Sequence, residues 1–427
     1  MPKDATQPTR STPNSPIKTP KPPQILYIDL NSCFATIEQQ ARPLLRYKPL
    51  AITNRLVPNS CIITASYEAK AKGVKVGMRR PEAEALCPGL IFTESEPSKY
   101  IYIHERLKQI MLDYSPTVTM KSIDEGVIDL SKSPPPIKER PILEIANELK
   151  SRLKSEVGCY MRSNVGLASN CFLAKLAAGL HKPDGLDLIT PKNLRKVLEP
   201  LSLTDLPGIN TRLERRLKAY QINTPLEFLD ASEETLRKQV FRSIDGTKWY
   251  KRLRGIEVDV YQNTIKSIGR QYVLESRCLT RQEVWQRLAH LCEDVGYRLR
   301  SKNLYARGIY LWATRYNGLS YKTHFLGQTP FSSDMAILEI AKNLYRNLPD
   351  ELQIIGVTLY KLTDTPAPQI SLFEEELRRP EKISTAIDTI NRRFGARTIH
   401  SALTLGTDKV KAKLPFGSTR YLDHSIE

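Results

Sequence analysis

The sequence has 427 residues, 41% of them hydrophobic and 26% charged, which is typical of a folded chain of about two to four domains. No apolar run approaches ~18 residues and no apolar signal segment opens the chain, so neither a membrane span nor export is expected and the cytoplasm is the predicted location. Seven scattered cysteines without a C-x-x-C pair argue against a disulfide framework or a zinc site. The net charge of +18 favours a polyanionic partner, with nucleic acid first and an anionic membrane surface second.

The ordered chain is expected to begin after a basic tail. Residues 1–23 are rich in Pro, Ser, Thr and Lys, which predicts disorder. Residues 25–28 form an apolar run typical of a buried strand, and Asp29 ends it. A carboxylate at this position is a frequent metal ligand, but it also caps helices, and both interpretations stay open at this point. Phe34 follows in a predicted helix, at a spacing that suits the core.

The next segment offers a ring and a cation close together. Residues 49–55 and 60–65 predict strands, and residues 66–73 predict a short helix. Tyr67 and Lys70 in that helix would suit a phosphate-bearing ligand, although a solvated helix face is the simpler interpretation.

Two adjacent carboxylates, Asp124 and Glu125, lie between β-forming segments within residues 120–130. Neighbours in a strand point to opposite faces, so these two side chains diverge unless a turn or an ion gathers them. Taken alone, the pair predicts a solvated hairpin turn. Asp29 as a second acidic position makes a metal site the competing interpretation.

The following segments alternate between helix and strand. Residues 142–157 predict an amphipathic helix, residues 162–167 a strand, and residues 172–180 a helix of small residues with Lys175 at its centre. Residues 181–185 break that helix. This alternation predicts an α+β domain with a mixed sheet.

Residues 190–257 predict an all-helical region with the pattern of a helix-hairpin-helix, whose turn binds a DNA phosphate. The turn consists of Pro207, Gly208, Ile209 and Asn210. Asn210 stands where the motif has a second glycine, and Asn tolerates left-handed backbone. A plain helical hairpin is the alternative.

The last third of the chain predicts a basic unit of sheet and helices that suits nucleic acid. The strands are expected at 267–273, 308–313 and 354–362, and the helices at 281–302 and 334–347. Beyond a linker, Leu372 and Phe373 stand in a polar stretch, so a partner pocket is expected to bind them. A short helix at 383–394 and an irregular tail after Gly395 complete the chain.

Taken together, these motifs resemble the Y-family translesion DNA polymerases, the DinB/UmuC group, over about residues 24–400. The matching motifs are residues 27–35 (YIDLNSCFA), 64–70 (TASYEAK), 122–125 (SIDE), 165–170 (VGLASN), 174–177 (AKLA) and 206–209 (LPGI). Each motif is weak alone, and their order makes the resemblance specific.

The resemblance implies a right-hand, multidomain α+β fold. Its parts are a palm (24–32 and 101–183), fingers (33–100), a helical thumb (184–257), a little finger (264–363) and a C-terminal tail (364–427). It also implies low-fidelity, template-directed DNA synthesis from deoxynucleoside triphosphates. Asp29, Asp124 and Glu125, with the carbonyl of Leu30, would hold two Mg²⁺ ions, for which oxygen ligands are suited.

Further roles are implied residue by residue. Phe34 matches the steric gate against ribonucleotides, although its spacing also fits a core residue. Tyr67, Lys70 and Lys175 match the triphosphate contacts. Lys70 replaces the commoner Arg, which keeps the charge and loses the bidentate fork.

The tail is similar to the sliding-clamp-binding peptide of bacterial polymerases, with Gln369, Leu372 and Phe373 in the Q-x-x-L-F pattern. A monomer that binds primer-template DNA and the clamp is therefore expected. One alternative is a catalytically inactive scaffold bound to DNA and clamp, and another is a metal-dependent nuclease or nucleotide cyclase. Primer extension with Mg²⁺ tests the scaffold alternative, and the absence of DNA cutting and of cyclic product would exclude the nuclease or cyclase.

Overall fold

The computed structural model describes residues 22–259, 265–365 and 374–407, together with Val410. These residues divide into two compact units, one before residue 260 and one from residue 265 onward. The tail predicted for residues 1–23 lies outside the described residues except for its last two positions.

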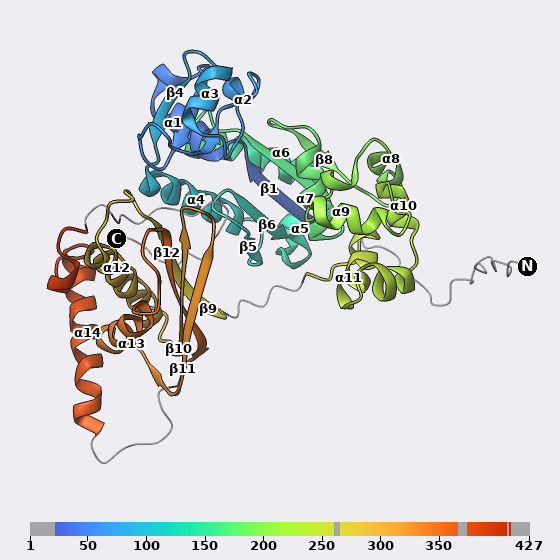
Figure 1. The fold of residues 1–427 in the computed structure, drawn as a ribbon. Coiled ribbons are helices and arrows are strands. Elements are labelled where there is room, and N and C mark those ends of the chain that lie inside the picture. Colours follow the sequence, from blue (N-terminus) through green and yellow to red (C-terminus); the bar gives the residue numbers. More distant parts are fainter. Residues whose placement is uncertain (1–21, 260–264, 366–373, 408–409, 411–427) are drawn as a thin grey trace, which may run out of the picture. The chain divides into compact units, whose positions relative to one another are not determined.

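The first unit, which contains β1 and α7 in Figure 1, is built on a five-stranded sheet. The strand order is β5-β6-β1-β7-β8. The strands are β5 Val118–Met120, β6 Glu125–Asp129, β1 Ile25–Leu30, β7 Ser163–Ala168 and β8 Leu186–Leu188. Strand β1 is antiparallel to both of its neighbours, whereas β7 and β8 are parallel. Leu26 and Ile28 are fully buried, which confirms the buried strand expected at the start of the ordered chain.

Helix α7 (Cys171–Leu180) packs closely on β1 and β7. A Cβ atom at Gly166 would lie 2.0 Å from the carbonyl oxygen of Ala174, so only glycine allows this approach. The small residues of α7 are thereby explained as packing residues. Helices α4 (Pro97–Leu112) and α6 (Ile142–Arg152) belong to the same unit, and α6 continues as a π-helical turn where one longer α-helix was expected.

A smaller three-stranded sheet with the order β3-β2-β4 lies in the same unit. Its strands are β2 Leu50–Thr53, β3 Ile62–Ala65 and β4 Ile91–Glu94, and the neighbouring helices are α1 Cys33–Ala41, α2 Tyr67–Lys70 and α3 Arg80–Leu86. Ala51, Ile62 and Cys87 form part of its own small core.

The helical region expected at residues 190–257 is confirmed. Its α-helices are α8 Leu194–Leu198, α9 Thr211–Lys218, α10 Pro225–Asp230 and α11 Ile244–Leu253. Trp249 of α11 anchors the region, because its ring lies 5.3 Å from that of Phe172 in α7 and 5.5 Å from that of Phe228. The helical region and α7 therefore share one core.

The second unit contains an antiparallel four-stranded sheet with the order β11-β10-β12-β9. The strands are β9 Ser267–Val273, β10 Tyr305–Arg315, β11 Ser320–Phe331 and β12 Leu352–Thr363, and the helices are α12 Arg281–Arg300 and α13 Asp334–Tyr345. Both helices pack on one face of the sheet (Figure 1), where Ile309, Leu311 and Val357 are buried. The strands and helices predicted for this region are all present.

Strand β11 is missing from the sequence prediction. It is an edge strand, largely exposed, and it contains Gly327 and Pro330, residues that weaken a strand pattern. Pairing with β10 along most of its length overrides that local preference.

Helix α14 (Glu374–Phe394) is longer than the expected short helix at 383–394, and it continues through Pro380. The part of the helix that was predicted docks on the rest of the second unit. Asp388 makes two hydrogen bonds, 2.6 and 2.8 Å long, with the guanidinium of Arg300, which also contacts Asp334 at 2.8 Å. The backbone N–H of Asp334 donates to Ser384. These contacts tie α14 to α12 and α13.

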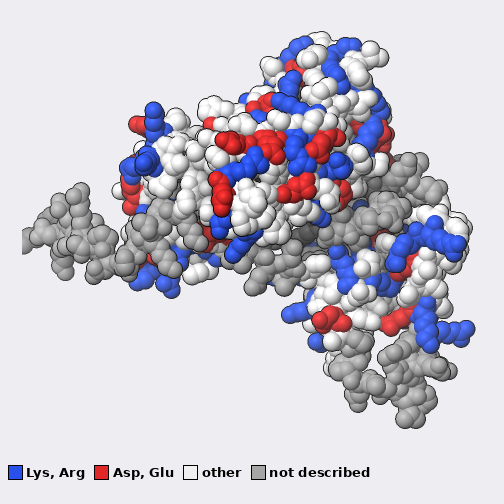
Figure 2. Space-filling view, turned by 180° about the vertical axis from the view of Figure 1, so that it is seen from behind, with Lys and Arg blue, Asp and Glu red and all other residues white. Residues whose placement is uncertain are grey.

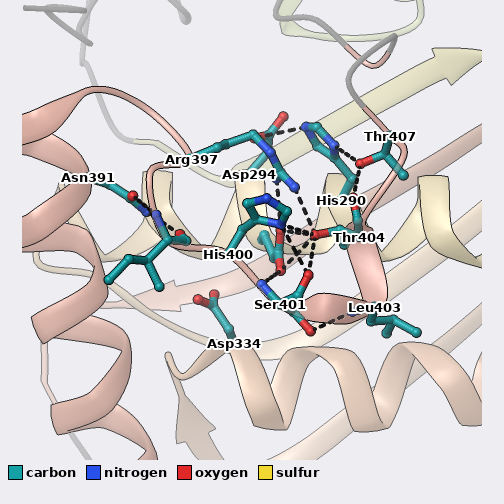
Figure 3. A network of polar contacts seen from close by, with 12 residues as sticks. His290, Asp294, Asp334, Asn391, Arg397, His400, Ser401, Leu403, Thr404 and Thr407 are labelled. Carbon is teal, nitrogen blue, oxygen red and sulfur yellow. Dashed lines mark hydrogen bonds and ion pairs between the residues drawn. The ribbon is translucent and has the colours of Figure 1, made fainter.

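The described segment after α14 is irregular, as expected, apart from a 3-10 helix at Ala402–Thr404, and it packs on α12 (Figure 3). Arg397 pairs with Glu293 of α12 at 2.8 Å, and Thr404 hydrogen-bonds to the same carboxylate. The hydroxyl oxygen of Thr407 and Nδ1 of His290 form a hydrogen bond 2.8 Å long. The described part of this segment therefore belongs to the second unit.

Candidate functional site

Two of the predicted carboxylates are neighbours across the central sheet. Asp29 in β1 pairs in register with Glu125 in β6, and opposite residues of antiparallel strands carry their side chains on the same face. Asp124 lies in a bend just before β6, where its carbonyl accepts the N–H of Leu30 at 2.8 Å. Because Asp124 lies in a bend and not in a strand, the alternation of side chains along a strand does not apply to it. Its side chain therefore need not point to the sheet face opposite Glu125.

Each of the two paired carboxylates has a lysine of its own. The ammonium of Lys175 in α7 lies 2.9 Å from both oxygens of Glu125. The hydroxyl of Tyr27 donates to Oε2 of Glu125 at 2.8 Å. The ammonium of Lys182 lies 2.6 Å from Oδ2 of Asp29. Two fixed cations thus neutralise two of the three acids.

The carboxylates are in an environment that resists their charge. Burial raises the pKa of Asp29 to about 6, and the charges of Glu125 and Asp124 add to the rise while Lys182 opposes it. Burial likewise raises the pKa of Asp124, against the hydrogen bond donated by Ser122. Three buried or half-buried carboxylates in one place require cationic partners.

The donor set suits a hard divalent ion, since it offers carboxylate oxygens on neighbouring strands. In the part of the chain that the structure describes, however, no group of three or more His, Cys, Asp or Glu side chains is arranged to hold a metal. Lys175 and Lys182 each contact one of the three carboxylates, while Ser122 donates a hydrogen bond to Asp124. The role of these carboxylates as metal ligands stays a prediction.

Phe34 lies at the beginning of α1 and is buried. Its ring stacks on that of Tyr100 in α4, with centroids 4.2 Å apart and an interplanar angle of 12°. Packing is thus an observed role of Phe34. Its role as a steric gate stays a prediction.

Tyr67 and Lys70 are brought beside the same end of β1. The ammonium of Lys70 lies 2.8 Å from the hydroxyl oxygen of Ser32 and 4.9 Å from the centroid of the Tyr67 ring. Burial and the charge of Lys182 lower the pKa of Lys70. Burial also raises the pKa of Tyr67 to about 12. This juxtaposition agrees with a shared phosphate-bearing ligand, which stays a prediction.

Lys182, Tyr27 and Ser122 are site residues that sequence reasoning missed. The segment around Lys182 was interpreted only as the end of a helix. A usable signal was present, because a second lysine follows Lys175 in a short loop and stands directly before Pro183. Its partner Asp29 is 153 residues away, beyond any local pattern.

The predicted hairpin has the expected turn but not the expected backbone at Asn210. Gly208 adopts a left-handed conformation with φ of +90°. Asn210 is extended, with φ of −99°, and its side chain caps α9 by accepting the N–H of Leu213 at 3.0 Å. The tolerance of Asn for left-handed backbone is therefore not used. Ile209 is buried in the helical core, and a 3-10 helix, Leu203–Asp205, precedes the turn.

The clamp-binding residues Gln369, Leu372 and Phe373 lie outside the described residues. Among the described residues, no helix is both long enough and apolar enough to cross a membrane.

Comparison with known proteins identifies the family. The impB/mucB/samB family matches residues 28–179, and the C-terminal domain of the impB/mucB/samB family matches residues 265–372. DNA polymerase IV of Pelotomaculum thermopropionicum is 33% identical over 396 residues, covering 89% of this chain and 95% of that protein. DNA polymerase IV of Moorella thermoacetica is 33% identical over 404 residues, covering 89% and 96%. DNA polymerase IV 1 of Bacillus subtilis is 27% identical over 401 residues, covering 91% and 95%.

Solved structures show the same fold. A Y-family DNA polymerase chimera of Dbh and Dpo4 superposes with a TM-score of 0.69 at 23% identity, covering 80% of this chain and 99% of that chain. The insertion ternary complex of Dbh DNA polymerase gives a TM-score of 0.55 at 22% identity, covering 79% and 98%. The chain belongs to the Y family of DNA polymerases, the impB/mucB/samB family. The expected right-hand, multidomain α+β fold is confirmed.

Proposed function

We propose that this chain is a template-directed DNA polymerase that performs low-fidelity translesion synthesis by nucleotidyl transfer. The observation that carries the proposal is the pairing of Asp29 with Glu125 across β1 and β6, in a chain that matches the family through both of its domains. Related polymerases that align with this chain over nearly their whole length support the assignment. Primer-template DNA and deoxynucleoside triphosphates are the substrates.

Divalent metal ions are the cofactors that this family implies. Asp29, Asp124 and Glu125, with the carbonyl of Leu30, would hold two Mg²⁺ ions, and their oxygen donors support that choice. When bound, such a pair of ions activates the primer 3′-hydroxyl and neutralises charge on the triphosphate. The bend before β6 contributes by keeping Asp124 beside the end of β1, through the hydrogen bond to Leu30.

The incoming nucleotide would be bound by residues on both sides of the carboxylates. Lys175 and Lys70 supply positive charge for the triphosphate, and both already lie at the carboxylate end of the sheet. The ammonium of Lys70 lies over the ring of Tyr67, which is a cation–π contact. Phe34 would exclude a 2′-hydroxyl with its ring, which stacking on Tyr100 holds rigidly.

DNA would be bound by the hairpin and by the second unit. The hairpin turn at Gly208 exposes backbone that suits a phosphate, and α9 begins directly after it.

In the second unit, the uncovered face of the sheet carries Tyr310 and Trp312, opposite His324 and Lys322. Lys and Arg side chains are interspersed with Asp and Glu on the face shown in Figure 2. The net charge of +18 supports attraction to DNA.

The domain bounds inferred from the sequence are carried into the proposal: palm 24–32 and 101–183, fingers 33–100, thumb 184–257 and little finger 264–363. The division of the described chain near residue 260 supports a separate little finger. Gln369, Leu372 and Phe373 would bind a bacterial sliding clamp. The enzyme would act as a monomer in the cytoplasm. Its template would be the chromosomal DNA.

Primer extension tests the function. Purified protein with Mg²⁺ and all four deoxynucleotides should extend a primer past an abasic site as well as on undamaged template. A protein that binds the DNA tightly and adds no nucleotide would instead match the inactive scaffold. Cleavage of the labelled template without extension would identify a nuclease.

A further inference from the structure

The loop between α7 and β8 is held in one place by contacts to the central sheet, and it carries Lys182. Asn164 in β7 accepts the N–H of Gly185 at 3.2 Å through its side-chain oxygen. The N–H of Asp184 donates to the side-chain oxygen of Asn31 at 2.8 Å. Asn31 is two residues beyond Asp29. The backbone around Lys182 is therefore fixed relative to the end of β1.

From this position the Lys182 side chain reaches a carboxylate of the proposed active site. Its ammonium lies 2.6 Å from Oδ2 of Asp29. The side chain of Asp29 is only 17% exposed and that of Lys182 36% exposed, so the pair is partly shielded from water. Partly shielded charges interact more strongly than fully solvated ones. This ion pair is therefore a strong local contact and differs from a solvated surface pair.

The two lysines of the site contact their carboxylates differently. Lys175 contacts both oxygens of Glu125, whereas the contact between Lys182 and Asp29 involves Oδ2. A divalent ion bound to Asp29 would bring two positive charges to the same carboxylate. Such an ion and the ammonium of Lys182 repel each other at this distance, so binding of one weakens binding of the other.

We propose that Lys182 is the resident counter-ion of Asp29, and that a divalent cation must displace it in order to bind. Lys182 then acts as a positioning residue that sets the divalent-ion affinity of the site. Before the ion arrives, its ammonium lies against Oδ2 of Asp29. The inference deepens the proposed function, on which it rests, because it takes Asp29 to be a metal ligand.

Metal titration of the protein without DNA or nucleotide tests the inference. The Mg²⁺ concentration that produces half of the thermal stabilisation is measured for the wild type and for Lys182→Gln, starting from EDTA-treated protein. Removal of the competing charge should lower this midpoint roughly fivefold or more. Bound Mn²⁺, counted by electron paramagnetic resonance, should show the same increase in affinity.

Matched variants separate competition from a general loss of charge. Lys154 pairs with Asp184 at 2.7 Å in the same loop, so Lys154→Gln removes an equal charge from a carboxylate that is not a proposed ligand. Lys154→Gln and Lys182→Arg should both keep the wild-type midpoint. Lys182→Met, which keeps the apolar stem, is the second test variant if Lys182→Gln unfolds.

An unchanged or higher midpoint in Lys182→Gln or Lys182→Met overturns the inference, and so does an equal shift in Lys154→Gln. In an Asp29→Asn background, Lys182→Gln should leave the midpoint unchanged, because the shared carboxylate is gone. The readout is independent of polymerase activity. If the wild type extends primers and Lys182→Gln has the wild-type Mg²⁺ midpoint, only this inference is refuted. If Lys182→Gln lowers the midpoint and the wild type extends no primer, only the proposed function is refuted.

Discussion

Lys175 and Glu125 are joined by two contacts of 2.9 Å, so a single ammonium bridges both carboxylate oxygens. The ring of Tyr27 lies beneath this ammonium, 5.3 Å from centroid to Nζ. The lysine is thus held at the carboxylates before any substrate arrives, which is the preorganisation that electrostatic catalysis needs.

Lys175→Ala should therefore reduce single-nucleotide insertion by about a hundredfold, the scale found when one preorganised donor is removed. The measurement is steady-state insertion of one deoxynucleotide on undamaged template. Lys175→Arg keeps the charge and should retain part of the rate. Equal rates for the wild type and Lys175→Ala would remove this residue from the site.

Asp124→Asn should abolish primer extension and leave DNA affinity intact, because it removes a proposed metal ligand and leaves the core untouched. Its pKa is raised by burial, so its charge is unfavourable in the metal-free fold. The EDTA-treated variant should accordingly melt at the wild-type temperature or higher. Asp113→Asn, at an exposed carboxylate of the same unit, is the matched control. Extension by Asp124→Asn at the wild-type rate would contradict the assignment.

Phe34→Leu separates packing from substrate selection. Leucine fills much of the same space but has no flat ring, so the stacking on Tyr100 is lost at a modest cost to stability. If the ring is a steric gate, ribonucleotides should be inserted at least ~10-fold better relative to deoxynucleotides, a difference of ~1.4 kcal/mol. Competition between the two nucleotide types in single insertion measures this ratio. A variant with lowered melting temperature and unaltered discrimination would assign Phe34 to the core alone.

His290 should make the second unit sensitive to acid. Burial lowers its pKa from 6.5 to about 4, against the charge of Asp294. Between these two values the unfolded chain binds more protons at this position, so the folded state loses stability as the pH falls from 6.5 towards 4. Calorimetry across this range should show a steeper fall for the wild type than for His290→Gln, which stays neutral. Parallel curves for the two proteins would show that His290 does not contribute to the loss of stability in acid.

Asp388→Ala should destabilise the second unit by about 1–3 kcal/mol, because Arg300 is left with an incompletely paired buried charge. Asp334 still contacts Arg300, so the loss should be smaller than for a fully orphaned charge. The exposed Thr389→Ala, one residue further along α14, is the control and should change stability little. Denaturant unfolding measures both. Equal loss in the two variants would mean that the ion pair adds nothing.

Sequence patterns predict much of this fold because its main strands and helices have strong local periodicity. The buried run of β1 and the apolar face of α12 are examples. Strand β11 is different, since its exposed edge position leaves a polar pattern interrupted by Gly327 and Pro330. The docking of α14 also escapes prediction, because Asp388 and Arg300 are 88 residues apart and no period connects them.

The same distinction applies to the site. Asp29, Asp124 and Glu125 are identifiable because each belongs to a motif of the family that the sequence resembles, whereas the local pattern alone also allows a helix cap and a solvated turn. The role of Lys182 depends on where a loop returns in space, and that is decided by Asn31 and Asn164. The sequence motifs identify the three acidic residues, but only the tertiary fold shows that Lys175 and Lys182 lie beside two of them.

The anchoring of α14 has a consequence for how the chain can be shortened. The family's C-terminal domain ends at residue 372, yet Asp388 and Arg397 complete charges that belong to α12. Residues 366–373 are therefore flanked on both sides by parts of one folded body. A protein trimmed at the family boundary loses Asp388, one of the two counter-charges of Arg300, and Arg397, the partner of Glu293, whereas a tag added after residue 410 leaves both in place.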